Sequence, residues 1–224
     1  DEIRSRGLGD VYKRQTLRKA IPPVLIPRLY LLLILGGFQG VLGWYMVKSG
    51  LVDDPNVSQY RLTAHLGMAV FIYSLILWTV FDLSLNYNHA IRSRIKWMSS
   101  TLTLLIFLMI LSGGLVAGTR AGIPVPTWPL MGDTFIPPQI YSMNPSWLSA
   151  FEDMATIQFN HRMFAYLLTI FIVIFAIVLL GSNVPRFLKN GTTVLLFVLS
   201  LQVVLGISTP VSYTHLTLPT TSSV

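Results

Sequence analysis

The chain has 224 residues, of which 53% are hydrophobic and only 11% are charged, and it contains no cysteine. Soluble domains carry about 25% charged residues, so this composition excludes an ordinary soluble domain, and the lack of cysteine excludes disulfides, thiolate metal sites and haem attached through C-x-x-C-H. The formal net charge of +7 comes without a basic stripe interleaved with aromatic residues, so we attribute it to the basic loops of a membrane protein and expect no nucleic-acid partner.

Five apolar runs are predicted to cross a bilayer, which takes about 20 helical residues. In chain order they are 29–47, 62–83, 97–116, 157–180 and 194–207, the last being short. Only helices and closed barrels satisfy their backbone groups in lipid, and these runs are too uniformly apolar for barrel strands. The sequence therefore predicts an all-α fold, a polytopic membrane helix bundle. Glycines cluster in 36–43 and 113–118, a composition that fits close helix packing through small residues.

The two ends differ in composition from the rest of the chain. Residues 1–15 are polar and basic and lack the features of a signal peptide, and residues 211–224 change abruptly to Thr/Ser-rich sequence. Both ends resemble translated adapter sequence, so we interpret them as non-native tails around a native segment at 16–210. His215 is then an artefact residue.

Charged residues between the spans predict the direction of the chain. The basic ones on one side are Arg18, Lys19, Arg28, Arg92, Arg94, Lys96, Arg186 and Lys189. The acidic ones on the other side are Asp53, Asp54, Asp133, Glu152 and Asp153, accompanied there by Lys48, Arg61 and Arg120. By the positive-inside rule the N-terminus is expected to be cytoplasmic. His89 then lies in a cytoplasmic loop and is interpreted as a solvated residue.

A long connection at 119–153 is expected on the external side. It is rich in proline and aromatic residues ("GIPVPTWPLMGDTFIPPQIY"), and connections of this length are commonly functional. We expect a rigid cap on the membrane face. The chain is thus divided into 16–118, this external loop and 154–210.

Two histidines lie near the outer starts of the second and fourth spans. His65 follows Arg61 by four residues, and His161 directly precedes Arg162. At 1.5 Å per residue, both are expected about 5–10 Å below their helix starts. Ionisable residues inside a membrane point to function, and two histidines at matched depth favour haem ligation by imidazole. Helix–helix hydrogen bonds for the histidines, and an interfacial role for the arginines in place of propionate pairing, stay open.

The pattern Q-x-V-L-G occurs twice, at Gln39 and at Gln202. Both copies lie in spans expected to run outward, and internal repeats are common in membrane folds. If the repeat is real, a further histidine-bearing helix is expected beyond Val224.

Six stretches together resemble one family. They are "GGFQGVLGWYMVKSGL", "VSQYRLTAHLGMAVFI", "SGGLVAGTRAG", "TWPLMGDTFIP", "IQFNHRMFAYLL" and "LQVVLGIST". In this order they resemble haem A synthase of the mitochondrial and alphaproteobacterial branch. The resemblance implies eight transmembrane helices in two pseudo-symmetric four-helix halves. Five would be present, with 16–118 ending the first half and opening the second, and 154–210 continuing the second.

The resemblance also implies a reaction, the oxidation of the C8 methyl group of haem O to the formyl group of haem A for aa3-type cytochrome oxidase. His65 and His161 would be iron ligands in different halves, for haem b or for the substrate haem O. Arg61, Arg162 and Trp128 would help to bind these groups. The family's catalytic glutamate lies on a helix absent from this chain, so the fragment is expected to be inactive by itself.

The same resemblance implies the inner membrane of bacteria or mitochondria, with lipid, haem O synthase and an electron-transfer protein as partners. Whether the protein forms a homo-oligomer stays open. One alternative is a membrane b-type cytochrome that transfers electrons without modifying haem. Another is a transporter with a histidine relay, which should show helices broken by glycine or proline in mid-membrane.

Overall fold

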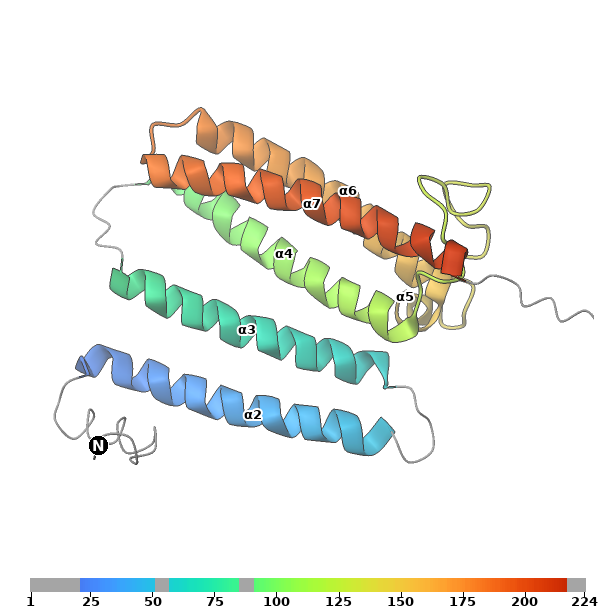
Figure 1. Ribbon diagram of the computed structural model, residues 1–224, viewed down its shortest axis with the longest axis horizontal. Coiled ribbons are helices and arrows are strands. Elements are labelled where there is room, and N and C mark those ends of the chain that lie inside the picture. The colour runs from blue at the N-terminus through green and yellow to red at the C-terminus, as the bar shows by residue number, and fades with distance from the viewer. Residues whose placement is uncertain (1–20, 51–56, 85–90, 217–224) are drawn as a thin grey trace, which may run out of the picture. The chain divides into compact units, whose positions relative to one another are not determined.

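The computed structural model describes residues 21–50, 57–84 and 91–216 (Figure 1). Within these ranges the regular structure is helical, and one isolated bridge joins Met131 and Thr134. The all-α prediction is therefore confirmed. The tail at 1–15 and His89 lie outside the described residues.

Five long helices contain the five predicted spans. They are α2 (Ile26–Gly50), α3 (Gln59–Ser84), α4 (Ser93–Thr119), α6 (Met154–Leu180) and α7 (Arg186–Leu216). Short turns η1 (Pro23–Leu25), η2 (Ser146–Leu148) and α5 (Ser149–Glu152) complete the order. All five long helices are long and apolar enough to cross a membrane. Most exceed the predicted spans at both ends, because an apolar run marks only the hydrocarbon-facing part of a helix.

The fifth span shows the largest difference from its prediction. The helix begins at Arg186 rather than near 194, and the Leu188 N–H closes its first turn on the Pro185 carbonyl at 3.1 Å. Thr192 lies inside this helix and donates its hydroxyl to the Leu188 carbonyl at 2.9 Å. Such bonds to the preceding turn let polar residues continue a helix, so counting apolar residues placed the start too late. The helix also continues through residues 211–216.

The chain divides into two compact units. Among the described residues, the first comprises 21–45 and 68–84, and the second comprises 46–50, 57–67 and 91–216. Helix α3 contributes to both.

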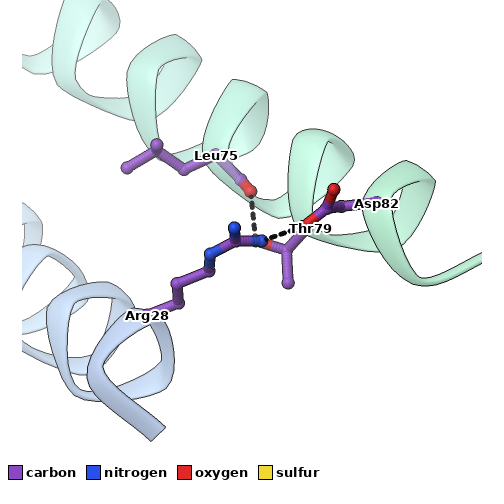
Figure 2. Close-up of polar contacts among 4 residues, drawn as sticks. All are labelled: Arg28, Leu75, Thr79 and Asp82. Atoms are coloured by element: carbon purple, nitrogen blue, oxygen red, sulfur yellow. Dashed lines mark hydrogen bonds and ion pairs between the residues drawn. The ribbon is translucent and has the colours of Figure 1, made fainter. Parts of the chain in front are cut away.

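In the first unit, an ion pair joins the beginning of α2 to the last turns of α3. Arg28 Nη1 lies 2.6 Å from Asp82 Oδ2 (Figure 2). The guanidinium also lies over the Trp78 ring, 5.4 Å from its centroid. Thr79 on the same stretch of α3 donates its hydroxyl to the Leu75 carbonyl at 2.8 Å. The pair brings opposite ends of the two helices together, so they run antiparallel.

In the second unit, α4 packs along α6, and α6 packs on α7 (Figure 1). The buried residues between these helices are Ile95, Leu102, Leu168, Ile172, Phe175 and Leu179. On α6 they recur at alternating steps of four and three, the spacing that keeps one helix face toward a partner. We call this contact between α4 and α6 the seam. Most other large apolar side chains are exposed, as expected for surfaces that face lipid.

The first turns of α3 lie against α4 through glycines. A Cβ atom at Gly114 would lie 3.2 Å from the Thr63 Cα, and one at Gly118 would lie 2.6 Å from the Gln59 Cα. The pair forms a G-x-x-x-G motif, whose missing side chains let helix backbones approach closely in membranes. The predicted role of the 113–118 glycines is confirmed at these two positions. Glycines 36, 37 and 40 have no described neighbour within 4 Å of such an atom.

Candidate functional site

His161 lies where the apolar seam ends. It is seven residues before the buried Leu168 and therefore on the same face of α6, turned toward α4. Opposite it, α4 presents Gly113, and a Cβ atom there would lie 3.5 Å from His161 Cε1. A glycine thus occupies the position that larger apolar residues fill further along the seam. The space it leaves accommodates the imidazole ring.

The neighbouring residue of α4 fixes one atom of this ring. Ser112 Oγ lies 3.0 Å from His161 Nδ1, within hydrogen-bonding distance. With Nδ1 engaged, Nε2 is the ring nitrogen available to a metal. An imidazole that ligates a metal through one nitrogen almost always has the other nitrogen hydrogen-bonded in this way.

Arg162 and Gln158, one helical turn apart on α6, hold the loop that follows α4. Arg162 Nη2 donates to the Val125 carbonyl at 3.2 Å, and Arg162 Nη1 donates to the Leu130 carbonyl at 3.3 Å. Gln158 Nε2 donates to the same Val125 carbonyl at 3.0 Å. Because a guanidinium has five N–H donors, these two bonds leave donors for an anionic group. The loop is therefore anchored directly beside the histidine.

The loop segment that contains Trp128 is folded by a threonine. Thr127 Oγ1 donates to the Leu130 carbonyl at 2.9 Å and accepts from the Gly132 N–H at 2.8 Å. Gly132 has a positive φ of 70°, a conformation that glycine adopts without strain. Trp128 itself is 48% exposed. The structure thus brings His161, Arg162 and the Trp128 segment to one end of the second unit.

The end of the loop is fastened to the first turns of α6. Asp153 caps the helix, because its carboxylate accepts from the Thr156 N–H at 2.8 Å. Thr156 is fully buried and accepts from the Tyr141 N–H at 3.2 Å, while the Tyr141 hydroxyl donates to Asn160 Oδ1 at 3.1 Å. These bonds hold Tyr141 and Asp153 of the loop to the first turns of α6.

Glu152 ties the same region to α3. Its carboxylate accepts from the Tyr60 hydroxyl at 2.5 Å and from Gln59 Nε2 at 2.9 Å. Both donors lie in the first turn of α3, which is thereby fixed against α5.

His65 and Arg61 lie on a different face of α3. The face in contact with α4 carries Gln59, Thr63 and Gly67. At about 100° per residue, His65 is turned about 200° from Thr63, and Arg61 lies beside it one turn earlier. His65 is therefore directed away from α4, which lies between α3 and the His161 side. The structure brings the two histidines to similar depths, six and seven residues into their helices, but does not join them in one site.

The described residues contain no group of three or more His, Asp or Glu side chains that would hold a bare metal ion. Haem needs only axial ligands from the protein, because the porphyrin supplies the other nitrogens. A single imidazole with Nδ1 engaged, a glycine beside its ring and an adjacent arginine fit that requirement.

Five long apolar helices and an imidazole set between two of them define a polytopic helical membrane protein with a candidate haem-ligand residue. Residues 11–221 match the family described as "Cytochrome oxidase assembly protein" (COX15-CtaA), and the chain belongs to this family. The resemblance seen in its motifs is thereby confirmed.

Curated relatives carry the name "Heme A synthase". The protein from Nitrosospira multiformis is 44% identical over 90% of this chain and 58% of its own length. The protein from Parvibaculum lavamentivorans is 46% identical over 69% of this chain and 45% of its own length. The protein from Paracoccus denitrificans is 41% identical over 84% of this chain and 51% of its own length. The chain thus spans about half of the length of the curated relatives it matches. No solved structure matches it significantly.

Sequence reasoning missed Ser112 and Glu152 as site residues and gave Gln158 no definite partner. Ser112 carried a weak signal, since it is a polar residue within an apolar run. Its partner depends on the register between α4 and α6, which the sequence does not state directly.

Proposed function

We propose that this chain is part of a haem A synthase, which oxidises the C8 methyl group of haem O to a formyl group. The observation that carries the proposal is the hydrogen bond between Ser112 and His161 Nδ1 in a chain of the cytochrome oxidase assembly family. It leaves Nε2 of a membrane-embedded imidazole for an iron. The name that the relatives carry supports the same activity and does not favour an electron-transferring b-type cytochrome.

The residues of this chain have distinct proposed roles. His161 ligates iron in one half of the protein, and His65 does so in the other, which agrees with their placement on faces turned apart. Arg162 offers its remaining donors to a propionate, and Arg61 does the same beside His65. The Trp128 segment covers the His161 site and limits the access of water. When bound, haem supplies the redox chemistry, while the protein binds and orients it.

The proposed setting is the bacterial cytoplasmic membrane, or the mitochondrial inner membrane in a eukaryote, with the N-terminus in the cytoplasm or its equivalent. Two halves of four helices, haem b as a resident group, an electron acceptor and haem O synthase as a partner belong to the same proposal. Residues 1–15 and 211–224 are proposed as non-native tails, although the family match includes part of each. Sequencing the parent gene through both junctions tests this: native coding sequence there would reject the tails.

The decisive experiment for the activity replaces His161 in the complete protein. We expect His161→Ala to abolish haem A in pigment extracts while the protein still inserts in the membrane. His89→Ala, in the predicted cytoplasmic loop, is the matched control and should leave the yield unchanged. A normal haem A yield from the His161 variant would reject the assignment. Bound haem without any conversion of haem O in the unaltered protein would instead favour the b-type cytochrome.

A further inference from the structure

The serine beside His161 behaves differently from other serines in the long helices. Ser74, Ser99 and Ser200 each donate to the carbonyl four residues earlier, at 2.8 to 2.9 Å. This is the usual solution for a hydroxyl inside an apolar helix. The hydroxyl of Ser112 instead lies 3.0 Å from a ring nitrogen on another helix. Its contact is therefore directed at the histidine.

The position of this serine follows from the register of the seam. Gly113 continues the α4 face that carries Ile95 and Leu102, and His161 continues the α6 face that carries Leu168 and Ile172. Gly113 admits the ring, with 3.5 Å between its would-be Cβ and Cε1. Ser112, one residue earlier, lies at the edge of the ring. Gly113 thus provides the space for the ring, and Ser112 provides the hydrogen bond.

The chemistry of the contact depends on which atom holds the proton. A neutral imidazole carries one N–H, and the nitrogen without it has the lone pair that a metal needs. If His161 Nδ1 donates to Ser112 Oγ, then Nε2 has that lone pair. A hydrogen bond accepted by the serine oxygen also fixes the rotation of the ring and makes the imidazole a better electron donor.

We propose that Ser112 is a positioning residue for His161. It accepts a hydrogen bond from Nδ1–H, selects the tautomer with a free Nε2 and fixes the rotation of the ring, so that Nε2 would be held ready to bind haem iron. The inference rests on the proposed function, because it takes His161 as a haem ligand. It adds a residue of α4 to the determinants of the iron's ligand field.

The test compares three variants of the complete, haem-loaded protein purified in detergent: Ser112→Ala, Ser112→Thr and Ser99→Ala. The Ser99 variant removes a hydroxyl from the same helix that bonds only to its own backbone. The readouts are haem retention on dilution, the midpoint potential by redox titration and the EPR g-values of the ferric state. Circular dichroism checks that each variant keeps its helices.

We expect Ser112→Ala to weaken haem retention by about 10-fold or more, in the range found for partners of metal ligands. Its midpoint potential should rise, because a weaker imidazole donor stabilises ferric iron less. Ser112→Thr, which keeps the hydroxyl, should restore retention and potential, and Ser99→Ala should match the unaltered protein. Identical g-values, potential and retention in Ser112→Ala would overturn the inference.

His161→Ala, measured with the same readouts, distinguishes a failure of the positioning role of Ser112 from a failure of His161 as the haem ligand. If it loses the haem signal while Ser112→Ala does not, the positioning role fails and the proposed ligand stands. If it keeps the signal unchanged, the proposed ligand fails and the positioning role fails with it.

Discussion

The imidazole of His161 faces Gly113, with Cε1 3.5 Å from the point where a Cβ atom would stand. That separation is an ordinary van der Waals contact, so the ring has room for one added methyl group and no more. Gly113 therefore limits how far the ring can move toward α4.

Substitution of Gly113 should show this limit directly. We expect Gly113→Ala to keep the haem spectrum of the complete protein, and Gly113→Leu to displace the imidazole and lose most of the bound haem. Overpacking of this kind commonly costs about 1–3 kcal/mol of stability as well. Gly206→Leu, at a position with no described neighbour within 4 Å, is the control. Equal haem retention in the two Gly113 variants would contradict the proposed contact.

Gly118→Ala should separate α3 from α4. The new Cβ atom would lie 2.6 Å from Gln59 Cα, a backbone atom that cannot rotate away. We expect destabilisation of about 1–3 kcal/mol, which exceeds the gain of about 1 kcal/mol that alanine brings over glycine in a helix. Gly191→Ala, with no described neighbour within 4 Å, should be neutral or stabilising. Unfolding of the chain in mixed micelles, followed by circular dichroism, measures both, and similar shifts would reject the close approach.

Replacement of Arg162 should release the loop after α4. Arg162→Gln loses the forked contact with the Val125 and Leu130 carbonyls, and hydrogen bonds to charged groups contribute about 1.5–3 kcal/mol each. Arg162→Lys should be intermediate, because an ammonium lacks the planar fork. Limited proteolysis in detergent should therefore cut residues 120–136 fastest in the glutamine variant.

The exposed Arg94 provides a comparison, and Arg94→Gln should leave the rate of cleavage unchanged. Equal cleavage in all variants would show that the arginine does not anchor the loop.

The Arg28–Asp82 pair should contribute little to stability. Its side chains are 34% and 51% exposed, and exposed pairs are worth about 0.2–1 kcal/mol before screening by salt. A double-mutant cycle with Arg28→Gln and Asp82→Asn should give a coupling energy in this range that falls as salt is added. Trp78→Leu, tested with Asp82 intact, measures the separate contact of the guanidinium with the ring. A salt-independent coupling of several kcal/mol would indicate a buried pair instead.

The helices were predictable because the bilayer imposes a length on apolar runs that needs no tertiary information. The rigid cap expected at 119–153 stays a prediction, which rests on the proline and aromatic residues of this segment. The start of α7 was not predictable from apolar residues, because its first turns contain polar residues whose hydrogen bonds are made within the helix.

The environment of His161 was only half predictable. Its depth follows from its position in the sequence, and so does its neighbour Arg162. Ser112 and Gly113 depend on how α4 and α6 are aligned, and the direction of His65 depends on which face of α3 meets α4. The alignment of α4 with α6 and the choice of the α3 face are both decided by packing at glycines and apolar side chains, most of them far from the histidines in sequence.

The seam between α4 and α6 runs without a break from Ile95 and Leu179 to Gly113 and His161. Closely packed interiors transmit strain, so we expect a displacement in one part of the seam to affect the rest of it. A cavity at Leu102 or Ile172 is therefore expected to shift the imidazole about three helical turns away. With haem bound at His161 as proposed, changes in apolar residues of the seam that do not touch the haem are expected to alter its redox potential, so thermal stability and redox behaviour should vary together.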